Sequence, residues 1–182
     1  MLELSMHILD IAENSIRAAA HLIEIGISED TFSDTLTIEI IDDGRGMDSV
    51  MAGKVLDPFF TTRTVRNVGL GLPLFEHAAK TADGNLSVKT EMGKGTHVLA
   101  QFMRSHIDRQ PLGSMSETVT ALIAGNPDID FLYTHRKDGK AFTLDTREMR
   151  EELEDVPLNN YRVLGFIKTF IEEGLKEISV DQ

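Results

Sequence analysis

The sequence predicts an α+β fold, a two-layer sandwich in which antiparallel strand pairs are covered by helices on one face. Two observations lead to this class: two pairs of segments alternate apolar and polar residues as strands do, and a helically spaced segment precedes each pair. Antiparallel pairs need no parallel crossover, which argues against a doubly wound sheet. We divide the 182 residues into a main domain, 1–104, and a smaller α+β extension, 105–182.

The first 42 residues predict a helix followed by a strand pair. Leu4 to Ala20 carries apolar residues at helical spacing and polar groups on the opposite face, as a helix lying on a sheet does. Apolar and polar residues then alternate from His21 to Ser28 and from Thr35 to Asp42. The turn-rich segment 29–34 joins these two strands.

The middle of the chain predicts an irregular stretch, a helix and a second strand pair. Residues 42–47 are rich in glycine, a short amphipathic piece reaches Leu56, and 57–68 shows no periodicity. A helix is predicted from Leu70 to Thr81. Strands are expected over 85–90 and 96–102, joined by the turn 91–95.

The extension begins where Asp108, Pro111 and Gly113 break the periodicity. Its predicted elements are a helix over 116–124, a hairpin of 131–135 with 141–145 turned by 137–139, and acidic helices over 146–154 and 159–178. This extension could pack on the open edge of the main sheet, dimerise, or form a docking surface for a target. The sequence leaves these three arrangements open.

The last predicted helix has an apolar face formed by Val163, Phe166, Ile167 and Phe170 at helical spacing. We expect this face to be buried within the fold and not reserved for a partner. The charged residues of the neighbouring segment 147–155 are expected to form a solvated surface, and no site is assigned to them.

Composition excludes several classes of function. There are 18 basic against 30 acidic side chains, a formal net charge of −12 and no dense run of Lys or Arg, so nucleic acid is not an expected partner. With no cysteine, disulfides, thiolate metal sites and a cysteine nucleophile are excluded. We find neither a signal peptide nor a stretch approaching the roughly 20 apolar residues of a membrane span. We therefore expect a soluble, cytoplasmic protein without a membrane partner.

Four short segments could carry chemistry, although each alone is compatible with ordinary structure. Asp10 and Asn14 project from one face of the first helix, four residues apart. Residues 42–47 (DDGRGM) follow a strand, where two glycines let a planar ligand approach and an Asp could accept a hydrogen bond from its amino group. Residues 68–72 (VGLGL) open a helix whose free amides favour phosphate, and 93–96 (GKGT) form a hairpin turn. Neither a dinucleotide-binding fingerprint nor a P-loop occurs.

Taken together and in this order, with residues 57–63 (DPFFTTR) between the second and third, these segments resemble the N, G1, F, G2 and G3 boxes of the GHKL ATPase superfamily. That superfamily includes the ATP-binding domains of histidine kinases, type II topoisomerases, MutL proteins, heat-shock chaperones and anti-sigma-factor serine kinases. The phenylalanine box and the short lid before Gly69 look most like the histidine-kinase branch. The resemblance covers about residues 5–102 and implies a Bergerat-type sandwich with a mixed, mainly antiparallel sheet.

The resemblance implies that ATP and Mg²⁺ bind among these boxes. Asn14 would hold Mg²⁺ through its amide oxygen, and Asp42 would accept a hydrogen bond from the adenine amino group. The glycine-rich turns would admit the base and aim amides at the phosphates, while Arg63 and Arg66 of the lid would screen phosphate charge. The implied ATP-binding residues are Asn14, Asp42, Gly44, Gly46, Met47, Arg63, Arg66, Gly69, Leu70, Gly71, Leu72, Gly95 and Thr96.

Asp10 departs from the family pattern. The position four residues before the magnesium-binding Asn is commonly Glu in the hydrolysing and serine-kinase branches and Asn in many histidine kinases. Because a carboxylate is kept here, Asp10 could act as the catalytic general base near the γ-phosphate. Alternatively, Asp10 supports the metal shell, or Glu13 takes the role of the base.

Two functions follow from the resemblance. None of the six histidines lies in a phosphoacceptor context, so we expect a stand-alone module without a phosphoacceptor domain. The first function is a kinase or ATPase that transfers the γ-phosphate to a partner protein in trans, or hydrolyses ATP slowly, in signalling or regulation. The second is a non-catalytic ATP-gated switch or anti-sigma-like regulator, in which ATP orders the lid and changes the affinity for a partner protein. A homodimer is compatible with both. The lid is too short for a chaperone or topoisomerase relative.

Overall fold

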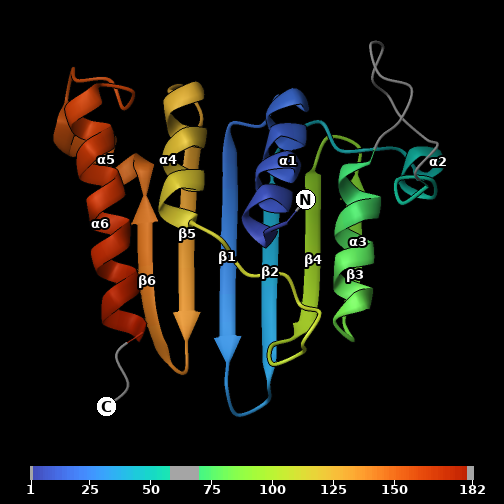
Figure 1. Ribbon diagram of the computed structural model, residues 1–182. Coiled ribbons are helices and arrows are strands. Elements are labelled where there is room, and N and C mark those ends of the chain that lie inside the picture. Colours follow the sequence, from blue (N-terminus) through green and yellow to red (C-terminus); the bar gives the residue numbers. More distant parts are fainter. Residues whose placement is uncertain (1, 58–69, 180–182) are drawn as a thin grey trace.

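The computed structural model describes residues 2–57 and 70–179, and they form a single six-stranded sheet with helices on one face (Figure 1). The strand order is β3-β4-β2-β1-β5-β6, and β1 pairs in parallel with β5 while every other neighbouring pair is antiparallel. The strands are β1 Leu22–Asp30, β2 Thr35–Asp42, β3 Asn85–Glu91, β4 Gly95–Met103, β5 Asp130–Lys137 and β6 Lys140–Asp145. The predicted α+β class with a mixed, mainly antiparallel sheet is confirmed.

The longer helices cover the same face of this sheet (Figure 1). The helices are α1 Leu4–Arg17, α2 Ser49–Ala52, α3 Gly71–Thr81, α4 Met115–Gly125, α5 Thr146–Leu153 and α6 Tyr161–Ser179. The side chains of Ile23, Ile25 and Ile27, alternate residues of β1, are at most 1% exposed beneath the helices. Among the described residues, no helix is both long enough and apolar enough to cross a membrane.

Element boundaries differ from the predicted ones by a few residues, for local reasons. The first helix ends at Arg17 and not at Ala20 because Ala19 adopts a left-handed conformation with φ 59°. The last hairpin turns on two residues, Asp138 and Gly139, both with positive φ. Such a turn matches the twist of the strands, so pairing extends to Lys137 and Lys140.

The C-terminal extension continues the sheet of the main domain. Strand β5 runs parallel to β1, from the pair Leu22 and Asp130 to the pair Glu29 and Lys137. Of the three arrangements left open by the sequence, the structure therefore shows packing on the sheet edge. Whether residues 1–104 and 105–182 are separate domains stays a prediction.

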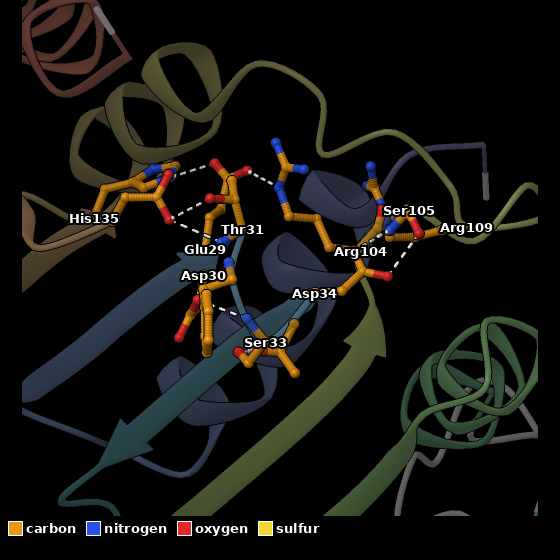
Figure 2. A network of polar contacts seen from close by, with 12 residues as sticks. Glu29, Asp30, Thr31, Ser33, Asp34, Arg104, Ser105, Arg109 and His135 are labelled. Atoms are coloured by element: carbon orange, nitrogen blue, oxygen red, sulfur yellow. Dashed lines mark hydrogen bonds and ion pairs between the residues drawn. The ribbon is translucent and has the colours of Figure 1, made fainter. Parts of the chain in front are cut away.

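A polar network fastens the extension to β1 and to the segment that follows β4 (Figure 2). The Glu29 carboxylate accepts from His135 Nε2 at 3.0 Å and from Arg104 Nε at 3.4 Å. Burial raises the pKa of Tyr133, whose hydroxyl keeps its proton and lies 2.9 Å from His135 Nδ1. Asp34 accepts from both the backbone N–H and the hydroxyl of Ser105. The network lies at the β1–β2 turn, the opposite end of the sheet from the last residue of β2.

The expectation for the last helix is wrong for two of its four apolar residues. Val163 and Ile167 are buried, but Phe166 is 61% exposed and Phe170 is 40% exposed. Successive helical residues are rotated by about 100°, so Phe166 and Phe170 each lie one step around α6 from a buried residue. Strand β6, over which α6 packs, is the last strand of the sheet, and the two rings lie beside its edge.

The network predicts a pH-dependent contribution of Glu29 to stability. The hydrogen bond from His135 lowers the pKa of Glu29, burial opposes this shift, and the charges of His135 and Arg104 add to it. A carboxylate with a lowered pKa stabilises the fold above its ordinary pKa of about 4.5, and this contribution is lost as the pH falls through the folded-state pKa. Glu29→Gln should cost on the order of 1–3 kcal/mol at pH 7 and flatten the acid side of the stability profile.

Urea unfolding between pH 3 and pH 8 measures this effect. Glu24→Gln, on the same strand but on the opposite face of the sheet, serves as the matched control. Identical pH profiles for Glu29→Gln and the wild type would show that the network contributes no pH-dependent stability.

Candidate functional site

Most of the segments predicted to bind ATP converge at the end of β2. Asp10 and Asn14 come from α1, residues 42–47 begin with the last residue of β2, Gly71 begins α3, and Gly95 lies at the start of β4. The contacts described below join these segments directly. The candidate site is therefore assembled from four parts of the chain that are distant in sequence.

Asp42 is a buried carboxylate held by two hydrogen bonds. Its side chain is 7% exposed, Ser15 Oγ donates to Oδ2 at 2.6 Å, and the Gly44 N–H donates to Oδ1 at 2.9 Å. Burying a charged group is costly unless it is hydrogen-bonded, and these two donors fix its orientation. Each oxygen keeps a further lone pair with which it could accept from a ligand. Sequence reasoning missed Ser15, whose role depends on a partner in another element.

Asp43, the second residue of the DDG sequence, has a different role. Its Oδ1 accepts from the N–H groups of His21 and Leu22, at 2.7 Å and 3.0 Å. Partial burial would raise the pKa of Asp43, but these backbone hydrogen bonds hold it below its usual value. Asp43 therefore anchors the start of β1, whereas Asp42 remains the candidate site residue.

Two glycines let the segment after β2 contact the β3–β4 turn. Gly46 has φ 64°, and a Cβ there would overlap the backbone carbonyl of Glu91. Gly95 has φ 90°, and a Cβ there would overlap the backbone carbonyl of Asp42. The sequence predicted that such glycines admit a ligand, whereas the immediate reason at these two positions is close packing of the protein's own backbone.

Thr90 connects the same segments through its hydroxyl. Its Oγ1 accepts from the Met47 N–H at 2.9 Å, donates to the Gly95 carbonyl at 3.0 Å and lies 3.1 Å from Thr96 Oγ1. One donor and two acceptor positions are thereby used, which is the full capacity of a hydroxyl. Sequence reasoning missed Thr90. Its position directly opposite Thr96 in the predicted hairpin was the available signal.

Asp10 and Asn14 lie beside the first residue of α3. A Cβ at Gly71 would overlap the Asp10 carboxylate and come 3.8 Å from Asn14 Nδ2. The predicted common face of these two side chains is thus the face that meets α3. The Asn14 amide oxygen accepts from Arg17 Nη2 at 2.6 Å, and Arg17 also pairs with Glu13 at 3.3 Å. The oxygen predicted to hold Mg²⁺ is therefore bonded to Arg17 in this structure.

The contacts described above do not involve the other predicted site residues. Leu70 is exposed and gives no side-chain cap to α3, so it leaves the backbone amides of the first turn without that partner. Leu72 packs partly buried against the core. Arg63, Arg66 and Gly69 lie outside the described residues.

Comparison with known families identifies the family of the chain. Residues 2–106 match the family of histidine kinase-, DNA gyrase B- and HSP90-like ATPases, a match that covers more than half of the chain. The chain belongs to this family. The protein therefore contains an ATP-binding domain of the histidine-kinase type.

Two curated kinases share part of this sequence. Sporulation kinase C of Bacillus subtilis is 30% identical over 94 residues, which are 52% of this chain and 22% of the kinase. Sensor protein kinase FleS of Pseudomonas aeruginosa is 30% identical over 110 residues, 60% of this chain and 27% of that protein. The chain therefore spans about a quarter of the length of these relatives.

A solved structure shares the fold. The crystal structure of the N-terminal domain of a DNA repair protein superposes with a TM-score of 0.57 and 21% identity, covering 80% of this chain and 53% of that one. At this identity the likeness concerns the fold alone. Its coverage exceeds the share matched by the family, so the similarity of fold extends into the C-terminal extension.

The two close backbone contacts predict a measurable cost of adding one methyl group. In Gly46→Ala the backbone must keep its positive φ although the residue now has a side chain, and the new Cβ must displace the Glu91 carbonyl. Together these two effects should lower the free energy of unfolding by on the order of 2–4 kcal/mol. Gly93→Ala is the matched control, because Gly93 has φ 76° but nothing within 4 Å of a Cβ. That control should cost only about 1 kcal/mol for the conformation.

Denaturant unfolding of the two variants separates the cost of the positive φ, which both variants bear, from the cost of the overlap with the Glu91 carbonyl, which only Gly46→Ala bears. A Gly46→Ala variant no less stable than Gly93→Ala would contradict the close packing of these two segments.

Proposed function

We propose that this protein binds Mg·ATP at the end of β2 and transfers the γ-phosphate to a partner protein in trans, or hydrolyses ATP slowly, in a signalling or regulatory role. The observation that carries the proposal is Asp42, a buried carboxylate oriented by Ser15 and Gly44 at the edge of a glycine-lined turn. Its fixed lone pairs suit recognition of one amino group. Adenine carries an amino group at C6, where guanine carries a carbonyl oxygen. The proposal assigns ATP selectivity to Asp42.

The adenine side of the site would be formed by the turn that Thr90 holds together. Gly44 has no side chain between Asp42 and the Ala18 carbonyl, where a Cβ would lie 2.9 Å from each. Met47, fixed through its N–H, would supply an apolar wall, and Thr96 would complete the pocket. All these residues belong to one hydrogen-bonded unit, so the pocket would need little reorganisation to accept the base.

The phosphates would lie at the start of α3. Its first amides and the positive end of the helix dipole favour an anion there, and Gly71 brings Asp10 and Asn14 to the same place. Mg²⁺, when bound, would neutralise phosphate charge. Asn14 fits the role of its ligand if Arg17 releases the amide oxygen, which is inexpensive because Arg17 is exposed and has Glu13 as a second partner. Arg63 and Arg66 of the lid would screen the remaining charge.

Asp10 is the better candidate for the general base. Its carboxylate lies against Gly71, where the terminal phosphate would be held, whereas Glu13 lies on the exposed side of α1 and pairs with Arg17. In this role Asp10 would orient the attacking hydroxyl or water and accept its proton.

Changing Asp42 tests the nucleotide site. Asp42→Asn keeps the shape of the side chain but removes the charge and one acceptor, so ATP should bind at least about tenfold more weakly, about 1.4 kcal/mol. Asp43→Asn, which alters the neighbouring anchor of β1, is the matched control and should keep the affinity of the folded protein for ATP. Isothermal titration calorimetry with Mg·ATP and Mg·GTP measures both. Unchanged affinity of Asp42→Asn for ATP would remove Asp42 from the site.

Changing Asp10 separates a kinase or ATPase from an ATP-gated switch. Asp10→Asn should lower turnover of γ-³²P-ATP by about 10²–10⁴-fold, the usual contribution of a general base, while ATP affinity holds. Glu13→Gln should retain most of the activity. The partner is to be captured from a lysate with ATP present and then supplied as phosphoacceptor. Wild-type protein that binds ATP but neither hydrolyses it nor labels the captured partner would contradict the enzymatic function and favour the switch.

A further inference from the structure

We propose that this protein forms a homodimer through the outer flank of α6, with the same helix of a second copy packed against it in antiparallel orientation. The flank consists of five side chains within less than a quarter turn of the helix at about 100° per residue: Arg162, Phe166, Phe170, Glu173 and Glu177. We call it the α6 flank. The proposal does not depend on the nucleotide site.

The inner side of α6 is already occupied by α4. Lys168 pairs with Glu117 at 3.2 Å, and Ser116 donates to Glu172 at 3.3 Å. Between these contacts and the α6 flank, the helix presents three side chains that are buried on the sheet: Val163, Ile167 and Ile171. In Figure 1, α6 lies at the outer end of the helical layer beside β6, with α4 on its inner side. The α6 flank therefore faces away from the rest of the molecule.

Two aromatic rings form the centre of the α6 flank. Phe166 and Phe170 are stacked, with ring centroids 5.8 Å apart and an interplanar angle of 10°. Phe170 also contacts Phe142 of the edge strand β6, at 5.2 Å between centroids, so this pair is held in place from below. A preordered, exposed aromatic pair is the type of feature that anchors protein interfaces, because little side-chain entropy is lost on binding.

The charges at the two ends of the α6 flank make it complementary to itself. In an antiparallel pair of helices centred between Phe166 and Phe170, each Phe166 lies opposite the Phe170 of the other copy. Arg162 of one copy then comes opposite Glu173 of the other and within reach of Glu177. Within residues 2–57 and 70–179, these three charged side chains make no ion pair. A two-fold axis forms every contact twice, as an isologous dimer requires.

A second copy suits this surface better than an unrelated acidic or basic partner. A uniformly charged partner would meet a like charge at one end of the α6 flank, whereas the antiparallel copy brings opposite charges to both ends. From Arg162 to Glu177 the α6 flank is about 24 Å long, at 1.5 Å per residue. Such a surface lies at the small end of specific interfaces, so the dimer should dissociate on dilution.

Charge reversal with rescue tests the dimer. Sedimentation equilibrium of the full chain without nucleotide should show a mass that rises with concentration from 20.2 kDa towards twice that value. Arg162→Glu places like charges opposite each other and should raise the dimer dissociation constant at least tenfold, as should the pair Glu173→Arg with Glu177→Arg. The triple variant restores opposite charges with reversed sign and should return to within a few-fold of the wild type. Phe166→Glu should abolish the dimer.

Lys89→Glu is the matched control, since it changes the net charge as Arg162→Glu does but lies on β3, at the opposite edge of the sheet. It should dimerise like the wild type. Circular dichroism and the melting temperature establish that each variant is folded. A wild type that stays monomeric at hundreds of micromolar overturns the proposal and leaves the α6 flank to another partner. A dimer that Arg162→Glu or Phe166→Glu leaves intact, or that the triple variant fails to restore, overturns it equally.

Discussion

The buried hydrogen bond between Ser15 and Asp42 is the contact on which the candidate site depends. At 2.6 Å it joins α1 to the last residue of β2. The Ser15 hydroxyl orients the Asp42 carboxylate, which would be costly to bury without a hydrogen-bond donor. Because α1 is fixed there, Asp10 and Asn14 meet the start of α3. The same carboxylate receives the Gly44 N–H, so the glycine-rich turn takes its course from Asp42 as well.

The two ends of the sheet serve different purposes. At the end of β2, backbone segments approach one another at Gly46 and Gly95, and Thr90 closes the turn above them. At the other end, Glu29 links the main sheet to the extension through His135 and also accepts a hydrogen bond from Arg104 (Figure 2). Strand β1 pairs with both β2, at whose end the candidate site lies, and β5 of residues 105–182. The family match stops at residue 106, and the extension supplies surfaces that the family does not define.

Local patterns predicted most of the elements, and tertiary contacts account for what they missed. Alternation found β1 and β2 because their apolar residues face one core, and helical spacing found α1, α3 and α6. The parallel pairing of β1 with β5 joins segments about a hundred residues apart, and no local pattern encodes it. Ser15 and Thr90 gain their roles from partners in other elements. Phe166 was misjudged because a helical pattern does not say where the sheet beneath it ends.

We propose that Mg·ATP binds where α1, the end of β2, the start of α3 and the β3–β4 turn meet. The most direct test is a titration of the ¹⁵N-labelled full chain with a non-hydrolysable Mg·ATP analogue, followed residue by residue in NMR spectra. We expect the amide signals of Asn14, Gly44, Gly71 and Thr96 to shift together and saturably, while those of His135 and Ser105 at the other end of the sheet stay in place. Saturable shifts confined to other elements, or no shifts at millimolar nucleotide, would contradict it.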